Sequence, residues 1–223
     1  MDIIKNLQKI KNELPPSVSL IAVSKTYSAE KIKELYNVGQ RKFGENKVQE
    51  MCEKYAQLPT DIQWHFIGHL QTNKVKYIAT FVSLIHSVDS LKLLQEINKQ
   101  AKKKKRIINC LLQIYIANED TKFGLTFEEF EKLLIAKELE EMQHIKIVGL
   151  MGMATNTNNI NQIANEFKTL KLFFEIQKNN FRQNANMQIL SMGMSSDYKI
   201  AVEQGSNLVR IGSLIFGDRI LTK

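Results

Sequence analysis

Short apolar runs alternate along the whole chain with segments of helical periodicity. The runs fall at residues 19–24, 62–68, 81–88, 107–117, 145–151, 187–192 and 207–212, and a short segment at 42–46, Lys-Phe-Gly-Glu-Asn, takes the second place in the series. Between them, apolar residues recur at spacings of three and four, as at Ile160, Ile163, Phe167, Leu170 and Phe174. Such spacings place side chains on one face of a helix, whereas short apolar runs are typical of buried strands. The pattern predicts eight strand–helix units, preceded by an extra amphipathic helix over residues 1–12.

Strands that alternate with helices form parallel sheets. The run at 107–117 is almost continuously apolar, as expected for a strand buried on both faces. Eight units fit one closed (β/α)₈ TIM barrel, an α/β fold, and no linker or change in composition divides residues 1–223 into further domains. An open, doubly wound sheet stays an alternative from the pattern alone, although no Gly-x-Gly-x-x-Gly motif follows the first strand.

The chain is basic, with 31 Lys and Arg against 23 Asp and Glu, for a net charge of +8. The densest basic cluster, residues 102–106, ends a predicted helix, where cations complement the helix dipole. No aromatic residues interleave with it to stack on bases. We interpret the cluster as a solvated helix end and expect no nucleic-acid partner. A nucleic-acid patch is the alternative, and a basic protein can also favour a small anionic ligand.

The remaining composition excludes several classes of protein. Cys52 and Cys110 lie far apart and form no CxxC pair, which indicates two reduced thiols. No apolar run reaches the roughly 18 residues that a membrane span needs, and the N-terminal helix lacks the features of a signal peptide. His65 and His69 lie four apart, but no cysteine or carboxylate cluster completes a metal site. We therefore expect a cytoplasmic protein that binds neither membranes nor metals.

In a (β/α)₈ barrel, functional groups lie at the C-terminal ends of the strands. Lys25 closes the otherwise apolar first strand. Burial and neighbouring cations lower the pKa of an amine, which frees it to form a Schiff base. An exposed lysine at a strand end is the alternative interpretation.

Two loops rich in small residues, at 191–196 and 210–213, follow the seventh and eighth predicted strands. Barrels usually place a phosphate site there. Gly212 lets the backbone approach a phosphate, adjacent N–H groups can form an anion nest, and Ser213 adds a hydroxyl donor. A tight turn without a ligand is the alternative, but two such loops side by side favour a phosphate.

Seven segments, in order along nearly the whole chain, carry a family resemblance. They are Ala-Val-Ser-Lys-Thr at 22–26, Phe-Gly-Glu-Asn at 43–46, Trp-His-Phe-Ile-Gly-His-Leu-Gln-Thr-Asn-Lys at 64–74, Lys-Phe-Gly at 122–124, Gly-Leu-Met at 149–151, Ser-Met-Gly-Met-Ser at 191–195 with Asp197, and Arg-Ile-Gly-Ser-Leu-Ile-Phe-Gly at 210–217. Together they resemble the pyridoxal phosphate homeostasis protein family, the single-domain relatives of alanine racemase. The resemblance implies a barrel like the N-terminal domain of alanine racemase and pyridoxal 5′-phosphate as the cofactor.

The resemblance also implies a role for each matching position. Lys25 is implied to hold the cofactor as a Schiff base, and Arg210 to face its pyridine nitrogen. The residues implied to cradle its phosphate are Gly212, Ser213, Ser191 and Met192. Asn46 and His69 are implied to belong to the pocket wall.

The implied place of Arg210 limits the chemistry. A guanidinium stays protonated at physiological pH and can only donate, so the pyridine nitrogen facing it should stay unprotonated. The ring is then a poorer electron sink, which disfavours decarboxylation and transamination. Racemisation stays conceivable, because the racemases resemble this arrangement.

The family likeness favours a carrier with no catalytic residues over an enzyme. In two-domain racemases a C-terminal domain supplies a catalytic tyrosine across a dimer interface, and we expect no such domain here because the chain ends at Lys223. We expect a monomer that binds pyridoxal 5′-phosphate reversibly, buffers it, and passes it transiently to apo-enzymes that depend on it. The alternatives are a cofactor-dependent amino-acid racemase and a Schiff-base aldolase that acts on a phosphosugar.

Overall fold

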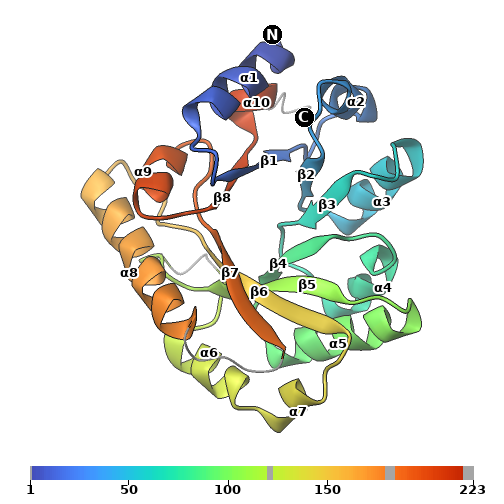
Figure 1. Ribbon diagram of the computed structural model, residues 1–223, viewed down its shortest axis with the longest axis vertical. Coiled ribbons are helices and arrows are strands. Elements are labelled where there is room, and N and C mark those ends of the chain that lie inside the picture. The colour runs from blue at the N-terminus through green and yellow to red at the C-terminus, as the bar shows by residue number, and fades with distance from the viewer. Residues whose placement is uncertain (1, 120–122, 179–183, 218–223) are drawn as a thin grey trace.

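The computed structural model describes residues 2–119, 123–178 and 184–217. In it, eight parallel strands close into a barrel in the order β1 to β8, and helices surround the barrel (Figure 1). The strands are β1 (Ser19–Val23), β2 (Lys42–Glu45), β3 (Gln63–Phe66), β4 (Leu84–Val88), β5 (Ile108–Ile114), β6 (Ile145–Gly152), β7 (Ala185–Ser191) and β8 (Leu208–Ile211). The closed barrel confirms the predicted (β/α)₈ fold and excludes the open sheet.

Helix α1 precedes β1, α10 follows β8, and the other helices lie between consecutive strands. They are α1 (Ile3–Glu13), α2 (Ala29–Asn37), α3 (Val48–Gln57), η1 (Thr72–Lys74), α4 (Val75–Ile78), α5 (Leu91–Lys103), α6 (Phe127–Leu134), α7 (Lys137–Glu140), α8 (Ile160–Lys178), α9 (Tyr198–Glu203) and α10 (Ser213–Phe216). The predicted N-terminal helix is confirmed, although Met1 lies outside the described residues. Helices α7 and α10 are not predicted, because a single turn is too short to show a period of three and four.

The apolar core has two layers, because alternate residues of a strand point to opposite faces. The larger layer lies between the strands and the helices and includes Phe43, Trp64 and Phe167. The smaller layer fills the barrel and consists of Ile21, Val23, Leu84, Leu111, Val148, Met151 and Leu208. The barrel is therefore a packed core, and ligands can reach it only at its two mouths.

Helix α1 braces the short helix α10 at the end of the barrel. The apolar face of α1 is buried, and Asn6 Nδ2 donates to the carbonyl oxygen of Ile215 at 3.0 Å. From the other side, the Tyr27 hydroxyl donates to the carbonyl oxygen of Gly217 at 2.5 Å, and its ring stacks on Phe216 with centroids 4.7 Å apart. These contacts fix the turn at Gly212, where β8 passes into α10.

The basic cluster at 102–106 is only partly a solvated helix end. Its four lysines are exposed, in agreement with the prediction. Arg106 is half-buried instead, and its Nη1 and Nη2 donate to the carbonyl oxygens of Ala79 and Val82 at 2.8 Å each. These two carbonyl oxygens follow the last turn of α4, where helical hydrogen bonds end, and Arg106 supplies the donors that they lack. Within the described ranges, no helix combines the length and the apolar character needed to cross a membrane.

Candidate functional site

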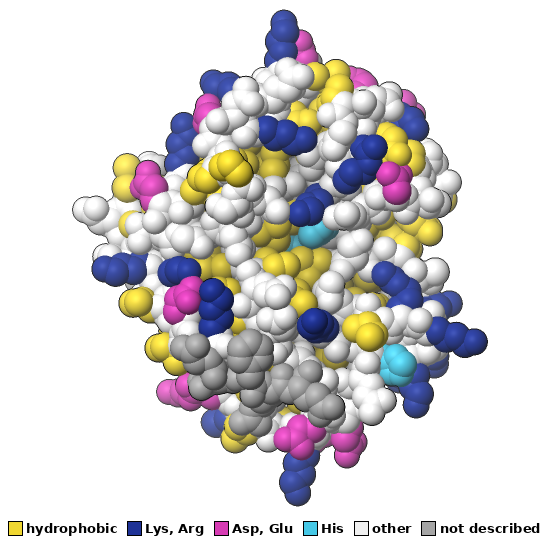
Figure 2. All heavy atoms as spheres, in the orientation of Figure 1, with side chains coloured by type: hydrophobic (Ala, Val, Ile, Leu, Met, Phe, Trp, Pro, Cys, Tyr) yellow, Lys and Arg dark blue, Asp and Glu magenta, His cyan; other side chains and the backbone are white. Residues whose placement is uncertain are grey.

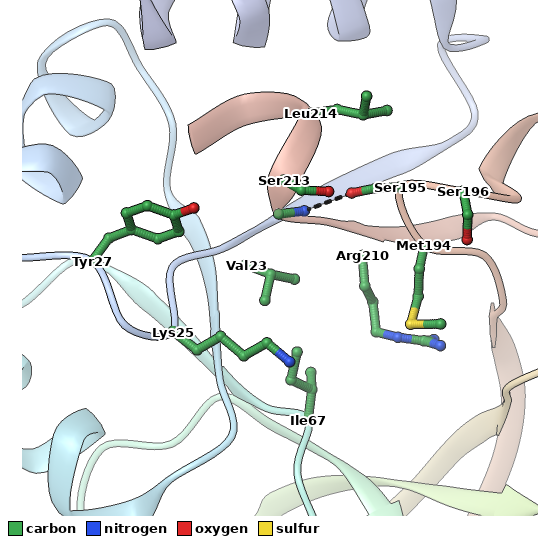
Figure 3. Close-up of a pocket in the computed structure, with 11 residues that line it drawn as sticks. Val23, Lys25, Tyr27, Ile67, Met194, Ser195, Ser196, Arg210, Ser213 and Leu214 are labelled. Atoms are coloured by element: carbon green, nitrogen blue, oxygen red, sulfur yellow. Dashed lines mark hydrogen bonds between the residues drawn. The ribbon is translucent and has the colours of Figure 1, made fainter. Parts of the chain in front are cut away.

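A cavity of about 380 Å³ opens at the C-terminal ends of β1 and β8, at the mouth where barrel function is expected. Four of the predicted site residues line it: Lys25, Arg210, Gly212 and Ser213. Figure 3 shows Lys25 and Arg210 reaching into it from different sides, below the loop that carries the serines. Its other lining residues are Val23, Tyr27, Ile67, Met194, Ser195, Ser196 and Leu214.

Lys25 reaches the cavity because it continues the inward-facing series of β1. Ile21 and Val23 point into the barrel, and the next residue of that parity is Lys25, just beyond the last residue of the strand. Its side chain is half-buried. The series therefore brings an amine to the point where the packed core ends and the mouth begins.

A buried ion pair on the outer side of the barrel fixes the backbone just before Lys25. Lys54 of α3 donates from Nζ to the carbonyl oxygen of Ser24 at 2.8 Å and to Glu45 Oε1 at 2.7 Å. Ser24 Oγ donates to the same Glu45 oxygen at 2.6 Å. Lys54 is only 5% exposed and Glu45 is fully buried. The position of Ser24, and with it that of Lys25, therefore depends on charges buried between β2 and α3.

The same network fixes the backbone just after Lys25. Glu50 Oε1 accepts from Lys54 Nζ at 2.7 Å and from the backbone N–H of Thr26 at 2.5 Å. Thr26 has a φ of +71°, in the left-handed region that β-branched residues rarely adopt. The hydrogen bond to Glu50 offsets part of the cost of this conformation. Lys25 therefore lies between two backbone positions that one lysine and two glutamates hold.

Glu45 is the member of this network whose carboxylate is incompletely hydrogen-bonded. Its second carboxyl oxygen, Oε2, has no hydrogen-bond partner in the described part of the chain. Burial raises the pKa of Glu45 to about 6, although the charge of Lys54 and the two hydrogen bonds oppose the rise. The carboxyl therefore takes up a proton at a higher pH than an exposed glutamate.

Arg210 is a buried cation whose hydrogen bonds tie β8 to β7 and β6. It is 4% exposed. Its Nη1 donates to the carbonyl oxygen of Ser191 at 2.9 Å and to Ser191 Oγ at 2.6 Å, and its Nη2 donates to the carbonyl oxygen of Gly152 at 3.2 Å. Burial lowers the pKa of Arg210 to about 10, against the opposing charge of Asp197. The guanidinium is therefore still protonated at neutral pH, and it lines the cavity as a permanent donor.

Two buried histidines continue the hydrogen bonds of Arg210 through the barrel. His86 Nδ1 lies 3.2 Å from Ser191 Oγ, and His86 Nε2 lies 2.9 Å from His65 Nδ1. Burial lowers the pKa of His65 to about 3, and burial, with the charges of His65 and Arg210, lowers that of His86 well below its usual value. Both rings are therefore neutral at physiological pH. The hydrogen bonds that lead from the charged guanidinium into the barrel thus run through neutral side chains.

Hydroxyl and backbone groups form the rim of the cavity opposite Lys25. The backbone N–H of Gly212 donates to Ser195 Oγ at 3.2 Å, the one hydrogen bond drawn in Figure 3. The backbone N–H of Met194 donates to Asp197 Oδ1 at 2.6 Å, which fixes the loop that carries the serines. A methyl group at Gly212 would lie 3.2 Å from the carbonyl oxygen of Val23, so β8 approaches β1 closely at this turn. The rim offers hydroxyl donors to an anion.

The other predicted site residues do not line this cavity. Asn46 follows β2 and His69 follows β3, but neither lines the cavity. The side chain of His69 is 47% exposed, and its Nδ1 lies 3.3 Å from Asp89 Oδ2. Its ring stacks on that of Phe123, with the ring centroids 4.7 Å apart. Lys122, which belongs to one of the family segments, lies outside the described residues. The pocket-wall roles of Asn46 and His69 stay predictions.

Ser191 and Met192 lie beneath the cavity rather than on its rim. Both are fully buried. Ser191 accepts from Arg210, and the backbone groups of Met192 pair with Ser206 Oγ at 3.2 and 2.9 Å. Their roles in a phosphate cradle stay predictions, and in this structure Ser191 also holds Arg210 in place.

Part of the site cannot be predicted from the sequence. The loop at 191–196 is predicted to bind phosphate, but the pattern does not show that the hydroxyls of Ser195 and Ser196 line the cavity. Tyr27 and the lysine of α3 carry no sequence signal, because each resembles an ordinary residue of an amphipathic segment. Among the described residues, no group of three His, Cys, Asp or Glu side chains could hold a metal ion.

Comparisons with known proteins point to one family. A family model described as alanine racemase, N-terminal domain, matches residues 2–220. The pyridoxal phosphate homeostasis protein of Aquifex aeolicus is 41% identical over 202 residues, which cover 90% of this chain and 86% of the relative. The protein of the same name from Haemophilus influenzae is 37% identical over 219 residues, which cover 97% and 91%.

Solved structures agree with these sequence relatives. PipY of Synechococcus elongatus without PLP has a TM-score of 0.91 at 35% identity, over 97% of this chain and all of that one. PipY with PLP bound has a TM-score of 0.87 at 34% identity, over the same shares of the two chains. An alanine racemase of Clostridium difficile has a TM-score of 0.79 at 18% identity, and the match covers 99% of this chain but 58% of the racemase, which shows a shared fold alone.

The pKa of Glu45 predicts a specific dependence of stability on pH. Because burial raises it from 4.5 to about 6, the folded state holds a proton that the unfolded chain has lost. This stabilisation is fully present below pH 4.5 and is lost as the pH rises through 6, by about 2 kcal/mol in total. Glu45→Gln does not titrate, so urea unfolding between pH 4 and 7 should show a smaller loss of stability in the variant than in the parent. The exposed Glu203→Gln serves as the control, and equal slopes in all three proteins would contradict the assignment.

Proposed function

The chain belongs to the alanine racemase N-terminal-domain family, among the pyridoxal phosphate homeostasis proteins, and on this premise we propose that it binds pyridoxal 5′-phosphate and serves in its homeostasis. This agrees with the resemblance that the seven sequence segments indicate. The single observation that carries the proposal is the cavity with the Lys25 amine and the Arg210 guanidinium on different sides and serine hydroxyls at its rim.

The cavity fits the cofactor in size and in the chemistry of its donors. Its volume of about 380 Å³ lies within the range of small-molecule sites. Lysine and arginine are its charged lining residues, and no carboxylate lines it within the described ranges, which suits an anionic ligand. When bound, pyridoxal 5′-phosphate supplies a reactive aldehyde and an aromatic ring that can accept electrons.

Lys25 is the residue that would hold the cofactor covalently. Its amine would condense with the aldehyde to a Schiff base and release water. The hydrogen bonds at Ser24 and Thr26 fix the backbone on both sides of Lys25, so the amine is positioned before a ligand arrives. Preorganisation of this kind lowers the entropy lost on binding.

Arg210 would donate to the pyridine nitrogen of the cofactor. Of its five N–H groups, three serve Ser191 and Gly152, so Nε and one N–H of Nη2 can serve a ligand. A protonated guanidinium cannot accept a proton and does not deliver one at neutral pH. Arg210 would therefore leave the ring nitrogen unprotonated, and a ring in that state would be a weaker electron sink, which favours holding the cofactor over reacting with it.

The rim at Gly212 would hold the phosphate. Ser195, Ser196 and Ser213 bring hydroxyl groups to one end of the cavity, away from the tip of the Lys25 side chain. Hydroxyl and backbone N–H groups are the usual neutral donors to a phosphate. Ser191 would act indirectly, by holding Arg210 in place.

The lining favours a carrier over a racemase. Moving a proton from one face of a substrate to the other requires an acid or base on each face. Lys25 supplies one such group, whereas the Tyr27 hydroxyl donates to Gly217, and no histidine, cysteine or carboxylate lines the described cavity. We therefore propose a cytoplasmic, monomeric carrier that buffers pyridoxal 5′-phosphate and passes it to apo-enzymes without turnover. The relatives named pyridoxal phosphate homeostasis protein favour this carrier over the aldolase alternative.

Changing Lys25 tests the covalent site. The purified protein incubated with pyridoxal 5′-phosphate should show a visible absorption band that borohydride removes, and Lys25→Ala should lose this band completely because no other amine lines the cavity in the described chain. Lys31→Ala, an exposed lysine on α2, is the matched control and should keep the band. Survival of the band in Lys25→Ala would place the covalent bond on another lysine.

Amino-acid turnover separates the carrier from the racemase. Holo-protein incubated with L-alanine or D-alanine should leave each enantiomer unchanged, measured by chiral chromatography over many equivalents of amino acid. Racemisation that is lost in Lys25→Ala would show that the site is catalytic and would overturn the carrier proposal.

A further inference from the structure

A second basin lies at the opposite mouth of the barrel and has a volume of about 600 Å³. It surrounds the N-terminal ends of the strands, since Ser19, Lys42 and Gln63 are the first residues of β1, β2 and β3. Figure 2 shows a hollow in the middle of one face, with a histidine side chain visible inside it and Lys or Arg side chains nearby. The cofactor proposed for the other mouth does not account for this basin.

The basin is positively charged and rich in hydrogen-bond donors. Lys42 and Arg106 line it, and no carboxylate does so within the described residues. Lys42 Nζ lies 2.9 Å from Ser19 Oγ, while two backbone carbonyls fix the Arg106 guanidinium at the edge. The other polar lining residues are Ser17, Gln63, Ser83, Asn109 and Asn207.

His65 forms part of the basin although it is only 5% exposed. Its Nδ1 is engaged with His86, so Nε2 is the ring nitrogen left for the basin. The direction of the hydrogen bonds follows from Arg210, which can only donate to Ser191 Oγ. The Ser191 hydroxyl then donates to His86 Nδ1, because no other acceptor for it is found in the described chain, and His86 Nε2 donates to His65 Nδ1. This sequence leaves the proton of His65 on Nε2, as a donor.

We propose that the basin is a second binding site, specific for a small oxyanion, with Lys42 as the cation and His65 Nε2–H as the donor at its floor. A cation, neutral donors and the lack of a carboxylate are the features that anion sites share. The basin is concave, and the packed barrel interior closes it below. Among the described residues, its lining offers no aromatic ring other than His65 for stacking, which disfavours single-stranded nucleic acid.

Inorganic phosphate is the probe for this site. Because phosphate could also compete at the cofactor cavity, the titration uses holo-protein reduced with borohydride, which keeps that cavity filled. Calorimetry at constant ionic strength should show saturable binding of about one phosphate. Lys42→Gln should weaken it about tenfold, because a hydrogen bond to a charged group is lost. Ser83→Asp should weaken it at least as much, by adding a negative charge to the lining.

The control variant is Lys33→Gln, which removes the same charge from the exposed face of α2. It should bind phosphate like the parent, and thermal melting should show that all variants are folded. In ¹⁵N spectra of histidine-labelled protein, phosphate should shift the Nε2 resonance of His65 and leave the resonances of His69, which follows β3 at the opposite mouth, unchanged. Absence of saturable binding, equal weakening in Lys33→Gln, or an unmoved His65 resonance would overturn the proposal. If the cofactor is not retained, the proposed function fails, and the same variants compared in the apo-protein still decide whether the basin binds phosphate.

Discussion

The structure depends above all on keeping one buried cation hydrogen-bonded. An unpaired charge inside a protein costs several kcal/mol, and Arg210 is almost completely removed from water. Ser191 and Gly152 satisfy it from the two preceding strands, and the neutral rings of His86 and His65 extend this support through the barrel. The guanidinium therefore presents a fixed, charged donor at the cavity, and this donor limits which chemistry a cofactor could carry out there.

A second set of buried charges determines where Lys25 lies. Lys54 and its two glutamates act from the outer side of the barrel, whereas the Lys25 amine acts on the inner side. This separation follows from the alternation of side chains along β1, which turns Ser24 outward and its neighbours inward. The network holds the backbone without occupying the cavity, so a ligand can enter without displacing it.

Most of the strands could be predicted from the sequence because they are short apolar runs, and the barrel rule then identified Lys25 and Arg210 as site residues. The roles of Ser191 and Met192 could not be deduced in this way. Sequence shows that a residue ends a strand, but not which side chain it meets across a closed barrel. The network of Lys54 could not be predicted either, because its members come from separate elements and resemble solvated charges on a helix and at a strand end. Helix α10 could not be predicted because it is only a single turn long.

Transfer of the cofactor tests the central claim, that this barrel carries pyridoxal 5′-phosphate for other proteins. Holo-protein is mixed with the apo form of an enzyme that requires pyridoxal 5′-phosphate, in the presence of an agent that traps free aldehyde, and recovery of that enzyme's activity is followed. The account predicts that holo-protein restores activity under conditions in which the same amount of free cofactor does not. Retention of the cofactor by the barrel, with no recovery of activity above that given by free cofactor, would contradict it.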